Sequence, residues 1–158
     1  MSSIALPHIS HVALDDLSEV AGVMERGFDP LYGEAWNPAQ CLAVLAMPGY
    51  ALRVARGDRG IVGFAIVRWV ADESELLLIA VDPAARRMGV GSALLADWIA
   101  LVVDKGVCRF FLEMRTDNPA LSLYIRHGFT ECGIRPAYYR GPDGTARDAV
   151  TMQRTCTD

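Results

Sequence analysis

The stretch ELLLIAVDPAARRMGVGSALL, residues 75–95, runs from an apolar strand through a basic turn into a helix. Gly89 and Gly91 lack a Cβ, so the turn can be tight and a ligand can approach the main chain closely. The first N–H groups of a helix have no partner inside it and lie at the positive end of its dipole. Together with the guanidinium groups of Arg86 and Arg87, these donors predict a site for a phosphate group, most naturally a pyrophosphate.

The glycine spacing argues against two common phosphate-binding motifs. A Walker loop ends in Gly-Lys-Ser/Thr, and no such ending follows Gly91. The dinucleotide fingerprint requires a third glycine where this chain has Leu94. The remaining pattern, Arg-x-x-Gly-x-Gly after Ile-Ala-Val-Asp-Pro, resembles the coenzyme A loop of the GCN5-related N-acetyltransferases (GNAT). Within that superfamily it is most like the RimI-type bacterial ribosomal-protein-alanine N-acetyltransferases.

The resemblance covers roughly Phe64 to Met152 and consists of short motifs in a fixed order. These are FAIV (64–67), DESEL (72–76), LEMR (112–115), Asn118, LYIRHGF (123–129), Tyr138-Tyr139 and RDAVTM (147–152). Their order and spacing together carry the resemblance. It implies an α+β fold with a mixed, mostly antiparallel sheet of about six to seven strands and about four helices.

Composition and charge restrict the class of protein. The 158 residues, 52% of them hydrophobic, fit one domain spanning residues 1–158. The net charge of −4 lacks the basic excess typical of nucleic-acid binding. No signal-type segment and no run of about 18 apolar residues occurs, so we expect a cytoplasmic protein without membrane association.

The four cysteines have no metal-site spacing. They are widely separated, without Cys-x-x-Cys or His-x-x-x-His, so we expect no metal, no disulfide framework and reduced thiols. They are Cys41, Cys108, Cys132 and Cys156.

Hydrophobic periodicity and turn residues predict the order of elements. Strands are expected at 8–13, 50–56, 61–70, 76–81, 107–114, 129–134 and 148–154. Helices are expected at 15–27, 38–47, 89–103 and 119–127. In the resembled family two adjacent parallel strands separate to admit the pantetheine arm of the coenzyme; here they would end near Val81 and Met114.

The resemblance implies acetyl-CoA as co-substrate and assigns its contacts. The pantetheine would bind the main chain of the strand at Ile79, Ala80 and Val81. The pyrophosphate would bind the turn formed by Arg86, Arg87, Met88, Gly89, Val90, Gly91 and Ser92. Asn118 would add a further contact to the coenzyme. The family pattern has one more residue between this Asn and the following Tyr than the present chain has between Asn118 and Tyr124. Asn118 is equally explained as a helix N-cap.

Acyl transfer to an amine requires a base, because an ammonium group has no lone pair, and an acid to protonate the departing thiolate. The resemblance assigns these roles to Glu113 and Tyr124. From the residues alone, Glu113 could instead pair with Arg109 or Arg115 at a strand end. Tyr124 could simply be a core aromatic residue at the end of an amphipathic helix.

The resemblance favours an acceptor site with aromatic walls. Tyr138 and Tyr139 are expected in a polar connection between the last two strands, where they can bind a peptide N-terminus or merely cover the sheet. Tyr32 and Trp36, in a loop rich in turn residues, would form the facing wall. His127 is expected to cap its helix, and we predict no catalytic role for it or for His8 and His11.

The leading hypothesis is an acetyl-CoA-dependent N-acetyltransferase that modifies a protein N-terminal α-amine by direct attack in a ternary complex. By resemblance, the acceptor would be the N-terminal alanine of a small-subunit ribosomal protein. The same fold could instead acetylate a small-molecule amine or a lysine side chain. A coenzyme A-binding module without catalysis is the third possibility.

Overall fold

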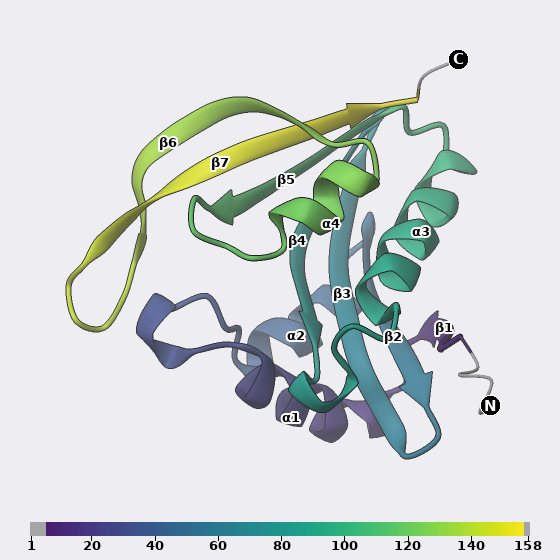
Figure 1. Cartoon of the computed structure of the whole chain (residues 1–158). Helices are drawn as coiled ribbons and strands as arrows, with labels where there is room; N and C mark the ends of the chain where they lie inside the picture. The colour runs from purple at the N-terminus through teal and green to yellow at the C-terminus, as the bar shows by residue number, and fades with distance from the viewer. Residues whose placement is uncertain (1–5, 157–158) are drawn as a thin grey trace.

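The computed structural model describes residues 6–156, and its centre is a seven-stranded sheet (Figure 1). The strand order is β1-β2-β3-β4-β5-β7-β6, and only the β4–β5 pair is parallel. The expected mixed, mostly antiparallel sheet is therefore confirmed. The strands are β1 (His8–His11), β2 (Tyr50–Gly57), β3 (Gly60–Val70), β4 (Glu73–Val81), β5 (Arg109–Arg115), β6 (Thr130–Arg140) and β7 (Ala146–Thr155).

Four helices pack against the sheet, as expected: α1 (Leu17–Gly27), α2 (Pro38–Leu45), α3 (Val90–Val103) and α4 (Leu121–Arg126). Side chains of β3 alternate between two hydrophobic cores, since successive residues of a strand point to opposite faces. Phe64 and Ile66 pack with α1 and α2, whereas Ala65 and Val67 pack with α3 and the buried Tyr124 of α4. The α1–α2 pair and the α3–α4 pair thus cover opposite faces of the sheet.

Strands β4 and β5 separate part-way along their length. Their paired residues run from Glu73 and Arg109 to Leu76 and Leu112, although β4 continues to Val81. The β3–β4 register shifts at the same level, which leaves Leu77 as the extra residue of a β-bulge. A bulge bends its strand and reverses which side chains face each core. The separation of these strands is therefore present, as the family resemblance implied.

The last two strands form a longer hairpin than predicted. The paired strands extend to Arg140 and from Ala146, so Tyr138 and Tyr139 belong to β6 rather than to a connection. The prediction was wrong because a register shift between Arg135 and Tyr139 absorbs Pro136, after which pairing resumes. Proline is tolerated at such a position because β6 is an edge strand.

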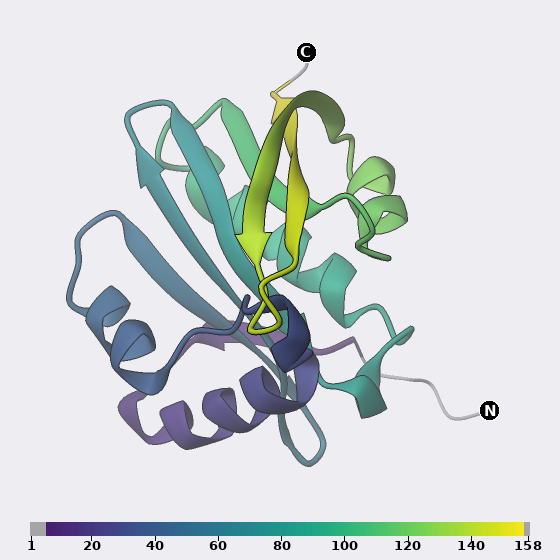
Figure 2. The same cartoon turned by 90° about the vertical axis from the view of Figure 1, so that its left-hand side faces the viewer.

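The hairpin tip rests on the loop between α1 and α2 (Figure 2). A Cβ at Gly33 would lie 2.9 Å from the carbonyl oxygen of Arg140. A Cβ at Gly141 would overlap the carbonyl oxygen of Leu31. Only glycine permits both approaches, so these two positions let the end of the chain close over an early loop.

Candidate active site

A cleft of about 290 Å³ opens where β4 and β5 separate. It brings together several residues proposed from the sequence and two further acidic residues, Glu34 and Glu75, of which Glu75 is paired with Arg68. The lining residues are Phe28, Gly33, Glu34, Trp36, Glu75, Leu76, Leu77, Leu78, Ile79, Leu112, Glu113, Met114, Asn118, Tyr124, Tyr138 and Tyr139.

Glu113 comes from β5, and its carboxylate lies at the edge of this cleft. Its Oε1 lies 2.8 Å from Nε of Arg135 and accepts a 3.4 Å hydrogen bond from the Thr151 hydroxyl. It pairs with neither arginine considered from the sequence, because Arg109 binds Asp72 and Glu73 whereas Arg115 binds Glu34 and Asp117. Glu113 also lines a second cleft of about 360 Å³. Its partners Arg135 and Thr151 line that second cleft as well.

Tyr124 lies on the opposite side of the sheet, in α4, and is only 4% exposed. Its ring packs edge-on against Phe129 with 6.3 Å between centroids. Burial raises the pKa of the phenol, and the negative charge of Glu34 raises it further. The phenol therefore stays protonated at neutral pH, which is the form required of a proton donor.

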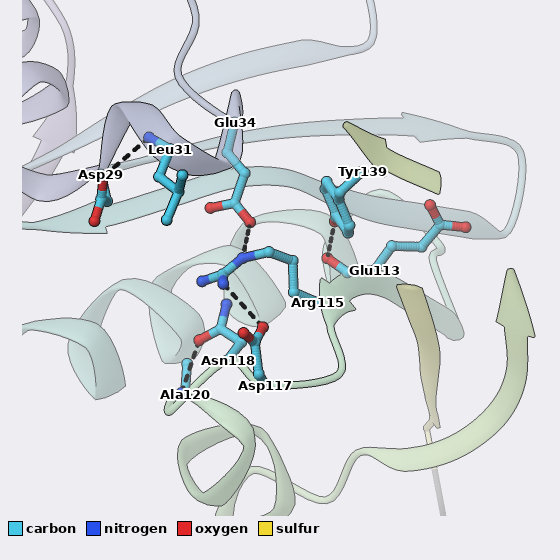
Figure 3. A network of polar contacts seen from close by, with 9 residues as sticks. All are labelled: Asp29, Leu31, Glu34, Glu113, Arg115, Asp117, Asn118, Ala120 and Tyr139. Atoms are coloured by element: carbon cyan, nitrogen blue, oxygen red, sulfur yellow. Dashed lines mark hydrogen bonds and ion pairs between the residues drawn. The ribbon is translucent and has the colours of Figure 1, made fainter. Parts of the chain in front are cut away.

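The two consecutive tyrosines of β6 both line the cleft. The Tyr139 hydroxyl donates a 3.3 Å hydrogen bond to the main-chain carbonyl of Glu113 (Figure 3). Burial, with the charges of Glu34 and Glu113, raises the pKa of Tyr139. Tyr138 is half exposed and packs edge-on against Tyr139.

Tyr32, proposed with Trp36 as an acceptor wall, is not among the lining residues. Its ring lies under the guanidinium of Arg115, 3.5 Å from the centroid, with Arg147 at 4.8 Å. These cation–π contacts draw the ring against β5 and β7. Tyr32 thus supports the loop, whereas Trp36 faces the cleft.

The basic turn leads into α3 with its amides uncovered. Arg87 and Gly89 have positive φ angles of 62° and 81°, and the first helical hydrogen bond runs from the Ala93 amide to the Gly89 carbonyl. Among the described residues, no carbonyl accepts from the amides of residues 87–92. Nothing lies within 4 Å of a Cβ built on Gly89. The turn therefore offers donors and space that fit a phosphate group.

The two arginines of the turn differ in their partners. Arg86 donates a 3.1 Å hydrogen bond to the carbonyl of Gly27 at the end of α1. Arg87 is exposed, as is Met88, and has no ion pair among the described residues. Arg87 is consequently the guanidinium better placed to meet an incoming anion.

Asn118 lines the cleft and also has a local structural role. Its side-chain oxygen accepts a 2.9 Å hydrogen bond from the Ala120 amide. This turn delays the start of α4 to Leu121, two residues later than predicted from Pro119. The N-cap alternative was wrong, because Ala120 is the N-cap of α4 and no side chain caps that helix. The Asn118 oxygen instead closes the turn that precedes the helix, and its position in the cleft leaves the coenzyme contact as a proposal.

Two contacts of the structure were not predicted from the sequence, although His127 is the C-cap of α4 as expected. The imidazole Nε2 of His127 lies 2.7 Å from the Ser92 hydroxyl, which joins α4 to the first turn of α3, directly after the basic turn. Glu34 lines the cleft and is bound through Oε1 by Nε of Arg115 at 2.5 Å (Figure 3). Neither contact has a local sequence signal, because the partners are far apart in the chain.

Comparison with known proteins places the chain in a family. Residues 48–131 match the family model described as the acetyltransferase (GNAT) domain. N-alpha-acetyltransferase RimI of Mycobacterium tuberculosis is 36% identical over 146 residues, which cover 89% of this chain and 85% of the relative. The chain belongs to the GNAT acetyltransferases.

Other GNAT relatives show the same fold and a common description. The [ribosomal protein bS18]-alanine N-acetyltransferase of Haemophilus influenzae is 42% identical over 92 residues, 58% of this chain. That match spans 63% of the relative, so less than two thirds of its length. The crystal structure of the Escherichia coli ribosomal-protein-S18-alanine N-acetyltransferase has a TM-score of 0.83 at 31% identity. The structural match covers 97% of this chain and 96% of the Escherichia coli chain.

Two further properties of this GNAT chain concern metals and membranes. Among the described residues, no group of three or more His, Cys, Asp or Glu side chains is placed to hold a metal ion. Within residues 6–156, no helix has the length and apolar character needed to cross a bilayer.

Proposed function

We propose that this protein is an acetyl-CoA-dependent N-acetyltransferase whose acceptor is the α-amine of a protein N-terminus, specifically the N-terminal alanine of a ribosomal protein. One observation carries the proposal: a cleft between the separated strands holds a carboxylate, Glu113, and a protonated phenol, Tyr124. The relatives described as bS18-alanine N-acetyltransferases support the choice of acceptor.

The coenzyme would be held by main-chain groups and by the basic turn. The free amides of residues 87–92 and the guanidinium of Arg87 suit its pyrophosphate. Ile79 lines the cleft in the part of β4 that has no β5 partner, where the main-chain groups of Ile79 and Val81, on either side of Ala80, can hydrogen-bond an extended pantetheine. Acetyl-CoA supplies an acetyl thioester there.

Glu113 and Tyr124 would divide the proton transfers. Glu113 accepts a proton from the acceptor amine, through water, so that the nitrogen lone pair can attack the thioester carbonyl carbon. The carbon–sulfur bond then breaks, and the sulfur leaves with its electron pair. Tyr124 donates its phenolic proton to that thiolate. The two groups approach from different elements, β5 and α4, so the reacting atoms would lie between them.

The acceptor would enter between the hairpin and the α1–α2 loop. Trp36 comes from the loop, whereas Tyr138 and Tyr139 come from β6, and all three line the cleft. Their rings offer apolar surface and hydroxyl groups for a peptide main chain.

The test is thiol release from acetyl-CoA by the purified protein. A peptide beginning with alanine is compared with the same peptide blocked at its N-terminus and with a panel of small amines. Turnover that requires the free N-terminus is the expected result. Turnover with small amines or lysine side chains alone would overturn the peptide acceptor, and binding of coenzyme without any turnover would indicate a non-catalytic module.

A further inference from the structure

The candidate active site contains a second carboxylate. Glu34 and Glu113 both line the cleft, but they come from opposite walls: Glu34 from the α1–α2 loop and Glu113 from β5. Figure 3 shows the Glu113 side chain pointing away from Glu34 and Arg115. The two acids are therefore placed for different tasks.

The loop holds Glu34 in a defined position. A 3-10 turn at Pro30–Tyr32 is closed by the Asp29 side chain, which accepts a 2.9 Å hydrogen bond from the Leu31 amide. Gly33 follows with a φ of 65° and turns the chain toward the cleft. The carboxylate that follows is thereby set on a short, capped turn rather than on a free loop.

Arg115 fixes one of the two carboxylate oxygens. Its guanidinium, 7% exposed as a residue, binds Oε1 of Glu34, binds Asp117 at 2.9 Å and packs over Tyr32. No described donor is hydrogen-bonded to Oε2 of Glu34. The side chain of Glu34 is 13% exposed and lines the cleft, so its second oxygen is available to a ligand there.

Electrostatics place the charge of Glu34 close to the reacting centre. The negative charge of Glu34 is the one charge that raises the pKa of Tyr124. It is also the charge with the largest effect on the pKa of Tyr139. The charge of Glu113 raises the pKa of Tyr139 but does not contribute to the raised pKa of Tyr124. Glu34 and Tyr124 thus line the same cleft, and the charge of Glu34 acts on the Tyr124 phenol.

We propose that Glu34 binds the acceptor's ammonium group beside Tyr124 and Tyr139, leaving Glu113 to accept the proton. This inference rests on the proposed function. An α-amine with an ordinary pKa near 8 arrives largely protonated at neutral pH, so an anionic oxygen held without a partner in a half-enclosed cleft would select it. Glu34 is then a substrate-binding residue, and Arg115 is the positioning residue that keeps its rotamer.

The experiment compares a charged and an uncharged acceptor. The protein saturated with coenzyme A is titrated calorimetrically with an alanine-initiated peptide and with its analogue in which lactate replaces the alanine, so that a hydroxyl replaces the ammonium. We expect the wild-type protein to prefer the ammonium peptide about tenfold or more, as for a hydrogen bond to a charged group. In Glu34→Gln this preference should disappear, while coenzyme affinity stays unchanged.

Asp117→Asn is the matched control, because it removes the other carboxylate bound to Arg115 from an exposed position. We expect it to keep the preference for the ammonium peptide. An undiminished preference in Glu34→Gln would overturn the inference, as would equal losses in Glu34→Gln and Asp117→Asn. Should the wild type bind neither peptide, the peptide acceptor is wrong. The same comparison with a small amine that the protein acetylates, and with the alcohol of the same shape, then decides the role of Glu34.

Discussion

His127 and Ser92 are joined by a 2.7 Å hydrogen bond between the imidazole Nε2 and the hydroxyl. Ser92 lies in the first turn of α3, and His127 ends α4, the helix that carries Tyr124. The main-chain carbonyl of His127 also accepts a 2.8 Å hydrogen bond from Arg154 of β7. The proposed proton donor is thus tied to the coenzyme turn through one imidazole ring.

This contact predicts a pH-dependent stability. Burial, followed by the charges of Arg154 and Arg126, lowers the pKa of His127. The folded state therefore favours the neutral ring, and its contribution to stability is complete above about pH 6.5, the ordinary histidine value, and is lost as the pH falls through the lowered pKa. Urea unfolding at about pH 7.5 and about pH 5.5 should show a smaller acid-induced loss in His127→Gln than in the wild type. Equal losses in both proteins would contradict the prediction.

Removal of the Tyr124 hydroxyl should affect turnover rather than folding. Tyr124→Phe keeps the ring in its packed position beside Phe129 but has no proton to donate. We expect kcat to fall by about 10² to 10⁴ with little change in KM for acetyl-CoA. Steady-state kinetics with Glu113→Gln, for which a loss of the same order is expected, completes the comparison. Full turnover in both variants would exclude the proposed acid and base.

Substitution of Arg135 should lower the turnover far less than substitution of Glu113, the carboxylate that it binds. The side chain of Arg135 is 60% exposed, and an ion pair in that setting contributes about 1 kcal/mol or less. Arg135→Gln should therefore lower kcat/KM by about fivefold or less. A loss as large as that of Glu113→Gln would instead mean that Arg135 contacts the reacting groups.

Arg87→Gly should separate stability from coenzyme affinity. The φ of 62° at Arg87 is strained for a residue with a Cβ, so glycine should leave the free energy of unfolding unchanged or raise it by up to about 1 kcal/mol. Loss of the guanidinium should raise KM for acetyl-CoA, because one charge-assisted contact to the pyrophosphate disappears. Urea titrations and initial rates measure the two effects. An unaltered KM would remove Arg87 from the coenzyme site.

The ion pair between Arg53 of β2 and Asp97 of α3 should be important for folding alone. It is bidentate, with both nitrogen–oxygen distances at 2.7 Å, and the Arg53 residue is 9% exposed. Asp97→Asn leaves a buried guanidinium without its counter-charge and should cost about 3–5 kcal/mol of unfolding free energy. Glu73→Gln, at an exposed pair with Arg109, should cost about 1 kcal/mol or less. Similar costs in both variants would contradict this difference.

Local sequence patterns predicted most of the elements, whereas the residues proposed for the cleft came from the family resemblance. The apolar run before Val81 and the glycines after it indicated a strand, a turn and a helix, and α3 begins at Val90. Periodicity worked there because a strand and a helix each impose their own spacing on apolar residues.

Contacts between distant segments could not be predicted in this way. The ion pair between Arg135 and Glu113 forms only because β7 and then β6 lie beside β5 in the sheet. The role of Glu34 depends on Arg115, which lies 81 positions away in the chain. The length of the final hairpin depends on a register shift around Pro136, for which the proline had suggested a loop.

The resting of the β6–β7 hairpin on the α1–α2 loop has a consequence for biosynthesis. A ribosome releases the loop with Glu34 and Trp36 early, then the coenzyme turn and Tyr124, and Tyr138 and Tyr139 only near the end. A nascent chain that has emerged as far as α4 therefore has the groups proposed to bind the coenzyme but only half of the proposed acceptor wall. Among these segments the proposed acceptor wall is completed last, when Gly141 closes onto Leu31.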